Sequence, residues 1–140
     1  MATLVIILLN RKYLITPGFV FLFPSLFMCL FRYYSVLHCD RNIVWSGWYR
    51  FYLGQSSARM PEKCVAEYRC GTHATLWING AHPVQLNEIV TRNVFGSWSG
   101  SCLYFASNTI QIKLCSGFYV YKVQLPSSCN LAYCTGTFLW

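Results

Sequence analysis

The eight cysteines among 140 residues constrain the fold of this chain more than any other feature. Their number is even, and no two of them have the Cys-x2-Cys spacing of a zinc knuckle. The most closely spaced pairs are Cys64 with Cys70 and Cys129 with Cys134, and both are too wide for that motif. The pattern therefore favours disulfide bonds over a zinc site and predicts a domain that folds in an oxidising compartment. Neither a metal nor another cofactor is expected.

The length suits one domain, and the composition favours β-structure. Aromatic residues make up 18% of the sequence, and 4 acidic residues accompany 11 basic ones. Aromatic and β-branched residues are typical of strands. The eight basic residues that follow Cys39 stand singly along the sequence, whereas nucleic-acid binding needs them in a clustered stripe. No nucleic-acid partner is therefore expected, despite a formal net charge of +7.

Residues 1–38 form a hydrophobic segment that differs from the rest of the chain. The run Tyr13–Phe31 contains 19 residues without a charge and follows a basic pair, which suits either a signal sequence or a membrane anchor. Pro17 and Pro24 interrupt the run, and no small-x-small cleavage site follows it. A third hypothesis is that this segment is translated non-coding sequence, joined to the true domain near Cys39. All three hypotheses stay open at this stage.

The remainder of the chain, residues 39–136, predicts an antiparallel all-β domain. Gly47–Leu53 and Ile110–Leu114 alternate between side chains expected in the core and side chains expected in solvent. Thr75–Gly80 is interpreted as a strand that enters an Asn-Gly turn, a sequence typical of a tight hairpin. Further strands are predicted at 88–95 and 118–125.

Sequence motifs for catalysis are weak in this chain. The segment Gly96–Gly100, GSWSG, resembles the hydrolase elbow Gly-x-Ser-x-Gly but has tryptophan in place of the serine. A thiol enzyme would pair Cys70 or Cys102 with His73, and an oxidised cysteine offers no thiolate. An enzyme is therefore not expected, and His73 and His82 are interpreted as surface or turn residues. No asparagine begins an Asn-x-Ser/Thr sequon, so no N-glycan is expected.

Several motifs occur in order around the cysteines: CDRNIVWSGWYRF, RCGTHATLWINGAHP, IVTRNVFGSWSGSC and CNLAYC. They resemble the cysteine-rich extracellular domain of uromodulin-like proteins, over Cys39–Gly136. The resemblance implies a small disulfide-rich antiparallel β domain, preceded here by the hydrophobic segment 1–38. The tail 137–140 has no counterpart in that family.

The resemblance also implies a disulfide pairing: Cys39 with Cys129, Cys64 with Cys102, and Cys70 with Cys134. The family partner of Cys115 lies upstream of Cys39. Cys29 is the candidate for that role, although its spacing and surroundings depart from the family pattern.

The fuller form of the family's domain has another bridge, between the positions that Phe95 and Leu103 occupy here. A bridge across so short a loop constrains the unfolded chain by only about 2.6 kcal/mol. Burial of one large apolar side chain returns about 1.5–3 kcal/mol. We therefore expect packing at Phe95 and Leu103 to replace this bridge.

The resemblance implies a non-catalytic extracellular structural or recognition module, a fragment of a larger glycoprotein that is secreted or anchored with the domain outside. Its ligand would be a protein or a carbohydrate. The expected recognition surface consists of Trp45, Trp48, Trp77 and Trp98. The alternative interpretation is that these tryptophans pack a thin core among the disulfides. The rival functions are a membrane-tethered receptor-type module, anchored by residues 13–31, and a thiol-dependent enzyme.

Overall fold

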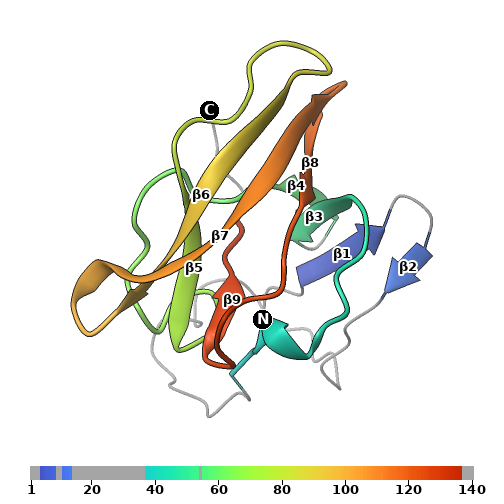
Figure 1. Cartoon of the computed structure of the whole chain (residues 1–140). Helices are drawn as coiled ribbons and strands as arrows, with labels where there is room; N and C mark the ends of the chain where they lie inside the picture. The colour runs from blue at the N-terminus through green and yellow to red at the C-terminus, as the bar shows by residue number, and fades with distance from the viewer. Residues whose placement is uncertain (1–3, 9–10, 14–36, 54, 137–140) are drawn as a thin grey trace, which may run out of the picture.

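A computed structural model describes residues 4–8, 11–13, 37–53 and 55–136. These residues form strands and one short 3-10 helix (Figure 1), so the prediction of an all-β, disulfide-rich domain is confirmed. Among them, no helix is long and apolar enough to cross a bilayer. The elements are β1 (Leu4–Leu8), β2 (Arg11–Tyr13), the 3-10 helix (Asp40–Asn42), β3 (Tyr49–Leu53), β4 (Ser56–Ala58), β5 (Ala74–Asn79), β6 (Ile89–Trp98), β7 (Ser101–Cys115), β8 (Phe118–Lys122) and β9 (Leu131–Tyr133).

The strands form a single sheet in the order β2-β1-β3-β8-β7-β6-β5-β9, with β4 paired to β3. Figure 1 shows β6 and β7 as a long curved pair, with β8 along the C-terminal part of β7. All pairs are antiparallel except β5 with β9, which run parallel in the register Ala74 to Leu131. The sheet is therefore antiparallel as predicted, with one parallel pair at this edge. A parallel neighbour needs a long crossover connection, and here β6, β7 and β8 provide it.

Tight two-residue turns join β6 to β7 and β7 to β8, and neither lies at the Asn-Gly position that the sequence suggested. The central residues of the turn between β6 and β7 are Ser99 (φ +50°) and Gly100 (φ +74°), the two positive dihedrals that a type I′ turn requires. The predicted turn at Asn79-Gly80 is wrong, because Asn79 belongs to β5 and pairs with Asn93. Residues 80–88 then form a longer connection to β6.

Alternating side chains of the central strands build the core. Tyr49 and Phe51 of β3 are buried, as are Ile110 and Ile112 of β7, which confirms the alternation predicted for both segments. The ring of Phe51 stacks on that of Tyr121 from β8 at a centroid distance of 4.7 Å. These buried side chains therefore form one core that connects β3 with β7 and β8.

The hydrophobic N-terminal segment is described only in part. The backbone of β1 pairs antiparallel with all five residues of β3, and β2 pairs with β1. Residues 14–36, which include most of the uncharged run and Cys29, lie outside the described residues. The domain boundary near Cys39 and the choice between anchor, signal and translated non-coding sequence stay predictions.

Candidate recognition site

Three disulfides join distant parts of the described chain: Cys39–Cys129, Cys64–Cys102 and Cys70–Cys134, with sequence separations of 90, 38 and 64. The structure thus brings together the same three pairs that the family resemblance implies. Cys115 ends β7 and forms no disulfide among the described residues. Its expected partner, Cys29, lies outside them.

Phe95 and Leu103, which occupy the positions of the family's additional bridge, lie in different surroundings. Phe95 of β6 packs against Trp77, its cross-strand neighbour in β5, at a centroid distance of 5.8 Å. Leu103 is 57% exposed, in a part of β7 where the register with β6 shifts. The expectation that packing replaces the bridge therefore fails at Leu103, because the irregular pairing leaves its side chain in solvent.

The four tryptophans expected to form one recognition surface do not do so. Trp77 is only 6% exposed and donates its indole N–H to the carbonyl oxygen of Cys102 at 3.1 Å. It cannot contribute to a surface, because both its ring and its N–H are engaged inside the fold. Trp98 is half-buried against Tyr68, and Trp48 is half-buried just before β3. Trp45, by contrast, lines a pocket.

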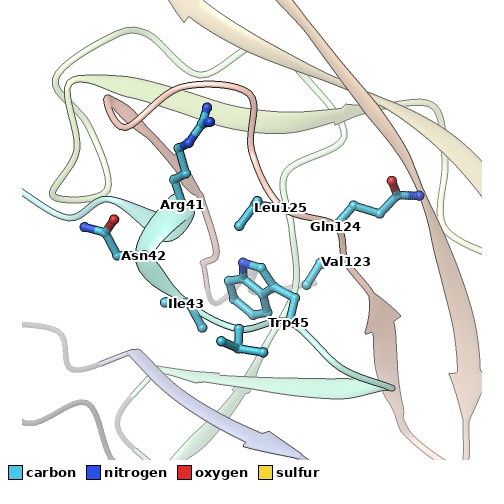
Figure 2. Close-up of a pocket in the computed structure, with 8 residues that line it drawn as sticks. Arg41, Asn42, Ile43, Trp45, Val123, Gln124 and Leu125 are labelled. Atoms are coloured by element: carbon cyan, nitrogen blue, oxygen red, sulfur yellow. The ribbon is translucent and has the colours of Figure 1, made fainter.

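This pocket, which we call the Trp45 pocket, is open to solvent and has a volume of about 530 Å³. One wall comes from the 3-10 helix and the residues after it, and the other from the segment that follows β8. Figure 2 shows the Trp45 ring between Ile43 and Val123, with Arg41 and Leu125 on the side of the ring nitrogen. The lining residues are Arg41, Asn42, Ile43, Val44, Trp45, Val123, Gln124 and Leu125.

The Trp45 ring is held from two sides. Its indole N–H donates to the carbonyl oxygen of Asp40 at 3.0 Å. The ring meets Tyr49 and Tyr133 edge-on, at centroid distances of 5.0 and 5.8 Å. Such edge-to-face pairs favour one ring orientation. The Trp45 ring is therefore held in one orientation within the pocket.

Hydrogen bonds through Tyr133 tie the two walls of the pocket together. The Tyr133 backbone N–H donates to Asp40 Oδ2 at 2.7 Å, and the Tyr133 hydroxyl donates to the Gln124 carbonyl oxygen at 2.7 Å. Burial raises the pKa of the Asp40 carboxyl to about 6, although the hydrogen bond from Tyr133 acts in the opposite direction. Burial also raises the pKa of Tyr133, so its hydroxyl stays protonated and can donate.

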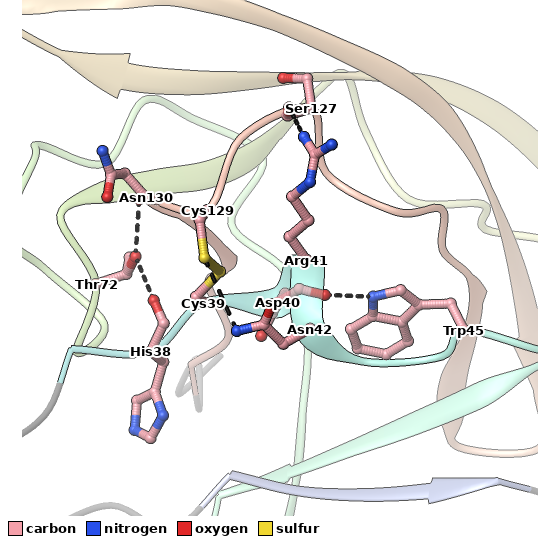
Figure 3. The surroundings of a disulfide bond; sticks show 10 residues. All are labelled: His38, Cys39, Asp40, Arg41, Asn42, Trp45, Thr72, Ser127, Cys129 and Asn130. Carbon is pink, nitrogen blue, oxygen red and sulfur yellow. Dashed lines mark hydrogen bonds between the residues drawn. A yellow bond between two sulfur atoms is a disulfide. The ribbon is translucent and has the colours of Figure 1, made fainter.

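A disulfide bond also joins the two walls of the Trp45 pocket (Figure 3). The Cys39–Cys129 disulfide joins the start of the 3-10 helix to the segment after β8. Beside it, the Arg41 guanidinium donates to the carbonyl oxygen of Ser127. The Thr72 hydroxyl lies 3.1 Å from each of two carbonyl oxygens, those of His38 and Asn130. The two walls of the pocket are thus also cross-linked covalently, close to Arg41.

A family model for the uromodulin-like domain matches residues 49–135 of this chain. The chain belongs to this family. The resemblance inferred from the motifs is thereby confirmed. In this uromodulin-like domain the second wall of the Trp45 pocket lies inside the matched range, and the first wall, with Arg41 and Trp45, lies just ahead of it.

The uromodulin-like domain has close relatives among known proteins. It is 47% identical over 98 residues to uromodulin of Mus musculus, and the match covers 69% of this chain and 15% of that protein. It is 45% identical over 98 residues to the pancreatic secretory granule membrane major glycoprotein GP2 of Canis lupus familiaris, covering 69% of this chain and 18% of the relative. The human GP2 is 41% identical over 98 residues, and the match again covers 69% of this chain and 18% of the relative. The chain therefore spans less than a fifth of the length of these relatives.

The residues considered for thiol chemistry are engaged elsewhere in the uromodulin-like domain. Cys70 and Cys102 both form disulfides, so neither offers a thiolate. His73 is half-buried, and its ring packs against those of Tyr68 and Trp98. These three side chains do not form a nucleophile and base pair.

His82 is buried and belongs to a polar network that the sequence did not reveal. Its ring lies 2.6 Å from Glu62 Oε1 through Nδ1 and 2.8 Å from the Tyr121 hydroxyl through Nε2. The interpretation of His82 as a surface or turn residue is therefore wrong. Burial lowers the pKa of His82 against the opposing effect of Glu62, which keeps the ring neutral. Only the fold brings these residues together, so no local spacing could have signalled the network.

The carboxylate of Glu62 completes this network. Burial alone would raise its pKa, but hydrogen bonds from the backbone and ring of His82, together with the charge of Arg59, outweigh that effect and lower it. Because Glu62 is ionised and accepts hydrogen bonds, His82 carries its proton on Nδ1. Both ring nitrogens of His82 are then engaged in hydrogen bonds within the fold.

Proposed function

We propose that this uromodulin-like domain is a non-catalytic extracellular recognition module of a larger glycoprotein, and that its ligand binds in the Trp45 pocket. The observation that carries the proposal is a positioned aromatic ring in an open pocket whose two walls are joined by a disulfide and by Tyr133. Binding is tighter when the site is ordered beforehand, because less side-chain freedom is lost.

The chemistry of the described side chains supports a binding role over a catalytic one. The thiols considered as nucleophiles are in disulfides, and His82 has both ring nitrogens occupied within the core. The Trp45 pocket is lined by apolar side chains, two amides and one guanidinium. Such a lining suits contact and orientation of a ligand.

The same cross-links support an extracellular location. Three disulfides in one small domain suit an oxidising compartment. The alternative, a receptor-type module tethered through residues 13–31, differs in attachment and not in the site. Extraction of expressing cells with alkaline carbonate distinguishes the two, since a spanning segment stays in the membrane pellet and a secreted chain does not.

Two exposed valines provide a matched test of the binding role. Val44 lines the pocket and is 89% exposed, whereas Val84 lies outside it and is 84% exposed. The full chain, produced by secretion and with its disulfides verified by mass mapping of unreduced peptides, is screened against arrays of glycans and of extracellular proteins. We expect Val44→Glu to abolish the binding signals of the parent chain and Val84→Glu to preserve them. Signals unaffected by Val44→Glu, or no signal on either array, would overturn the proposal.

A further inference from the structure

We infer that the Trp45 pocket selects a saccharide that carries a carboxylate, such as a uronic or sialic acid residue. This inference rests on the proposed function and specifies its ligand class. The Trp45 ring provides the stacking surface, and the Arg41 guanidinium provides the counter-charge for the carboxylate.

The first step concerns the aromatic surface. The Trp45 ring is held edge-on by two tyrosines and is bordered by Ile43, Val123 and Leu125. An aromatic face with apolar borders favours a ligand that presents a flat face of C–H groups. Sugar rings present such a face while keeping their hydroxyls at the edge, where water or an amide can bond them.

The second step concerns charge. Among the described residues, Arg41 is the one charged side chain that lines the pocket, and none of their carboxylates lines it. The nearest carboxyl in sequence, Asp40, is buried and bonded to the Tyr133 backbone, so a ligand does not meet it. A guanidinium at the rim without an acidic neighbour in the lining favours an anionic ligand over a neutral or cationic one.

The third step concerns the orientation of that guanidinium. One N–H of Arg41 donates to the Ser127 carbonyl oxygen, and Ser127 lies two residues from the Cys39–Cys129 bridge. A guanidinium has five N–H donors in a fixed planar fork, so this contact fixes the fork and leaves other donors for a carboxylate. Beside it, the Asn42 side chain lies on the same wall: its amide nitrogen contacts Cys129 Sγ at 3.8 Å, and its amide oxygen can accept hydrogen bonds from sugar hydroxyls.

The size of the pocket separates a saccharide from a protein partner. A volume of about 530 Å³ lies in the range of small-ligand sites. A stable protein partner would need a contact surface of at least about 500 Å² on this chain, well beyond one ring and its border. A sugar residue satisfies the stacking surface, the charge and the size together.

Two glycosides that differ only at one carbon test this inference. Methyl β-D-glucuronide and methyl β-D-glucoside are titrated into the full chain labelled with nitrogen-15. The Trp45 indole resonance, assigned by its loss in Trp45→Phe, reports binding. We expect the glucuronide to bind at least about tenfold more tightly, as a charge-assisted hydrogen bond would give. Arg41→Gln should remove this preference, and Lys63→Gln, at an exposed lysine outside the pocket, should leave it intact.

The outcomes separate the inference from the proposed function. Equal affinity for the two glycosides, or a preference that survives Arg41→Gln, would overturn the inference. If neither glycoside shifts the Trp45 resonance but an arrayed protein binds in a manner sensitive to Val44→Glu, the saccharide assignment is wrong and the recognition role stands. If neither glycoside shifts the Trp45 resonance and no arrayed ligand depends on Val44, both fail.

Discussion

The hydroxyl of Tyr121 lies 2.8 Å from Nε2 of His82, at the centre of the core. The same hydroxyl accepts a hydrogen bond from the Met60 backbone N–H at 3.1 Å. Since His82 carries its proton on Nδ1, the Tyr121 hydroxyl must donate to Nε2. A single oxygen atom thus satisfies two buried groups on two separate loops.

Replacement of Tyr121 by phenylalanine should therefore be more damaging than the loss of one hydroxyl suggests. Both the Met60 N–H and Nε2 of His82 would be left without a partner, and each such group costs about 1–3 kcal/mol. We expect Tyr121→Phe to lower the free energy of unfolding by about 2–6 kcal/mol in denaturant titrations. Tyr119→Phe is the matched control, because the Tyr119 hydroxyl bonds to none of the described residues. Equal losses in the two variants would contradict the network.

Asp40 should make the stability of the domain depend on pH. Its pKa rises from 3.8 to about 6 on folding, so its contribution is fully present below pH 3.8 and is lost as the pH rises through 6. The corresponding loss is about 3 kcal/mol. Asp40→Asn keeps an oxygen for the Tyr133 N–H and does not titrate.

The difference between Asp40→Asn and the parent chain isolates this effect from all other titrating groups. We expect the variant to gain about 3 kcal/mol relative to the parent between about pH 3.5 and pH 7, measured by denaturant titration at each pH. A difference that stays constant over this range would show that burial does not shift the pKa of the Asp40 carboxyl.

Gly96 of β6 occupies a place where the sheet tolerates no side chain. A Cβ atom there would lie 2.9 Å from Cδ2 of Leu131 and 3.0 Å from Cβ of Phe105. Leu131 is fully buried, so it has little room to move. We expect Gly96→Ala to destabilise the domain by about 1–3 kcal/mol through overpacking. The exposed Thr91→Ala on the same strand should change stability by less than about 0.5 kcal/mol, and a comparable change in both would contradict this account.

The Cys39–Cys129 bridge should matter for the Trp45 pocket more than the Cys64–Cys102 bridge does. In the loop-entropy model the two contribute about 4.6 and 3.9 kcal/mol, for separations of 90 and 38 residues. Both double serine variants should therefore unfold at lower denaturant concentration. Only Cys39→Ser with Cys129→Ser should shift and broaden the Trp45 indole resonance of the folded state, because that bridge joins the pocket walls and the other does not. If only the Cys64→Ser with Cys102→Ser variant perturbed this resonance, the Cys39–Cys129 bridge would not be what orders the pocket.

Much of the fold could be predicted from the sequence where local pattern and fold agree. Alternation over 47–53 and 110–114 identified β3 and part of β7, because one face of each strand is buried. The Asn79-Gly80 turn was misplaced, since the same dipeptide serves equally to end a strand before a long connection. The parallel pairing of β9 with β5 has no local signal, because partners far apart in sequence define it.

The site was predictable to a smaller extent. Aromatic composition indicates four candidate tryptophans, but the burial of Trp77 and the partial exposure of Trp45 in a pocket depend on which face of each segment the sheet covers. In the sequence Arg41 does not differ from the other scattered basic residues, and only the fold shows that it lines the Trp45 pocket. The partners of His82 lie 20 and 39 residues away, so sequence spacing gave no reason to group them.

The Cys39–Cys129 bridge has a mechanical consequence for a module built into a longer protein. Tension applied between His38 and Gly136 passes through Cys39, crosses the sulfur–sulfur bond to Cys129 and leaves along the short run to Gly136. The whole stretch from Asp40 to Ser128, with most of the sheet and the ring of Trp45, is bypassed by that load path. A pull that would unravel an uncrosslinked sheet therefore extends this domain by only a few residues while the bridge is intact.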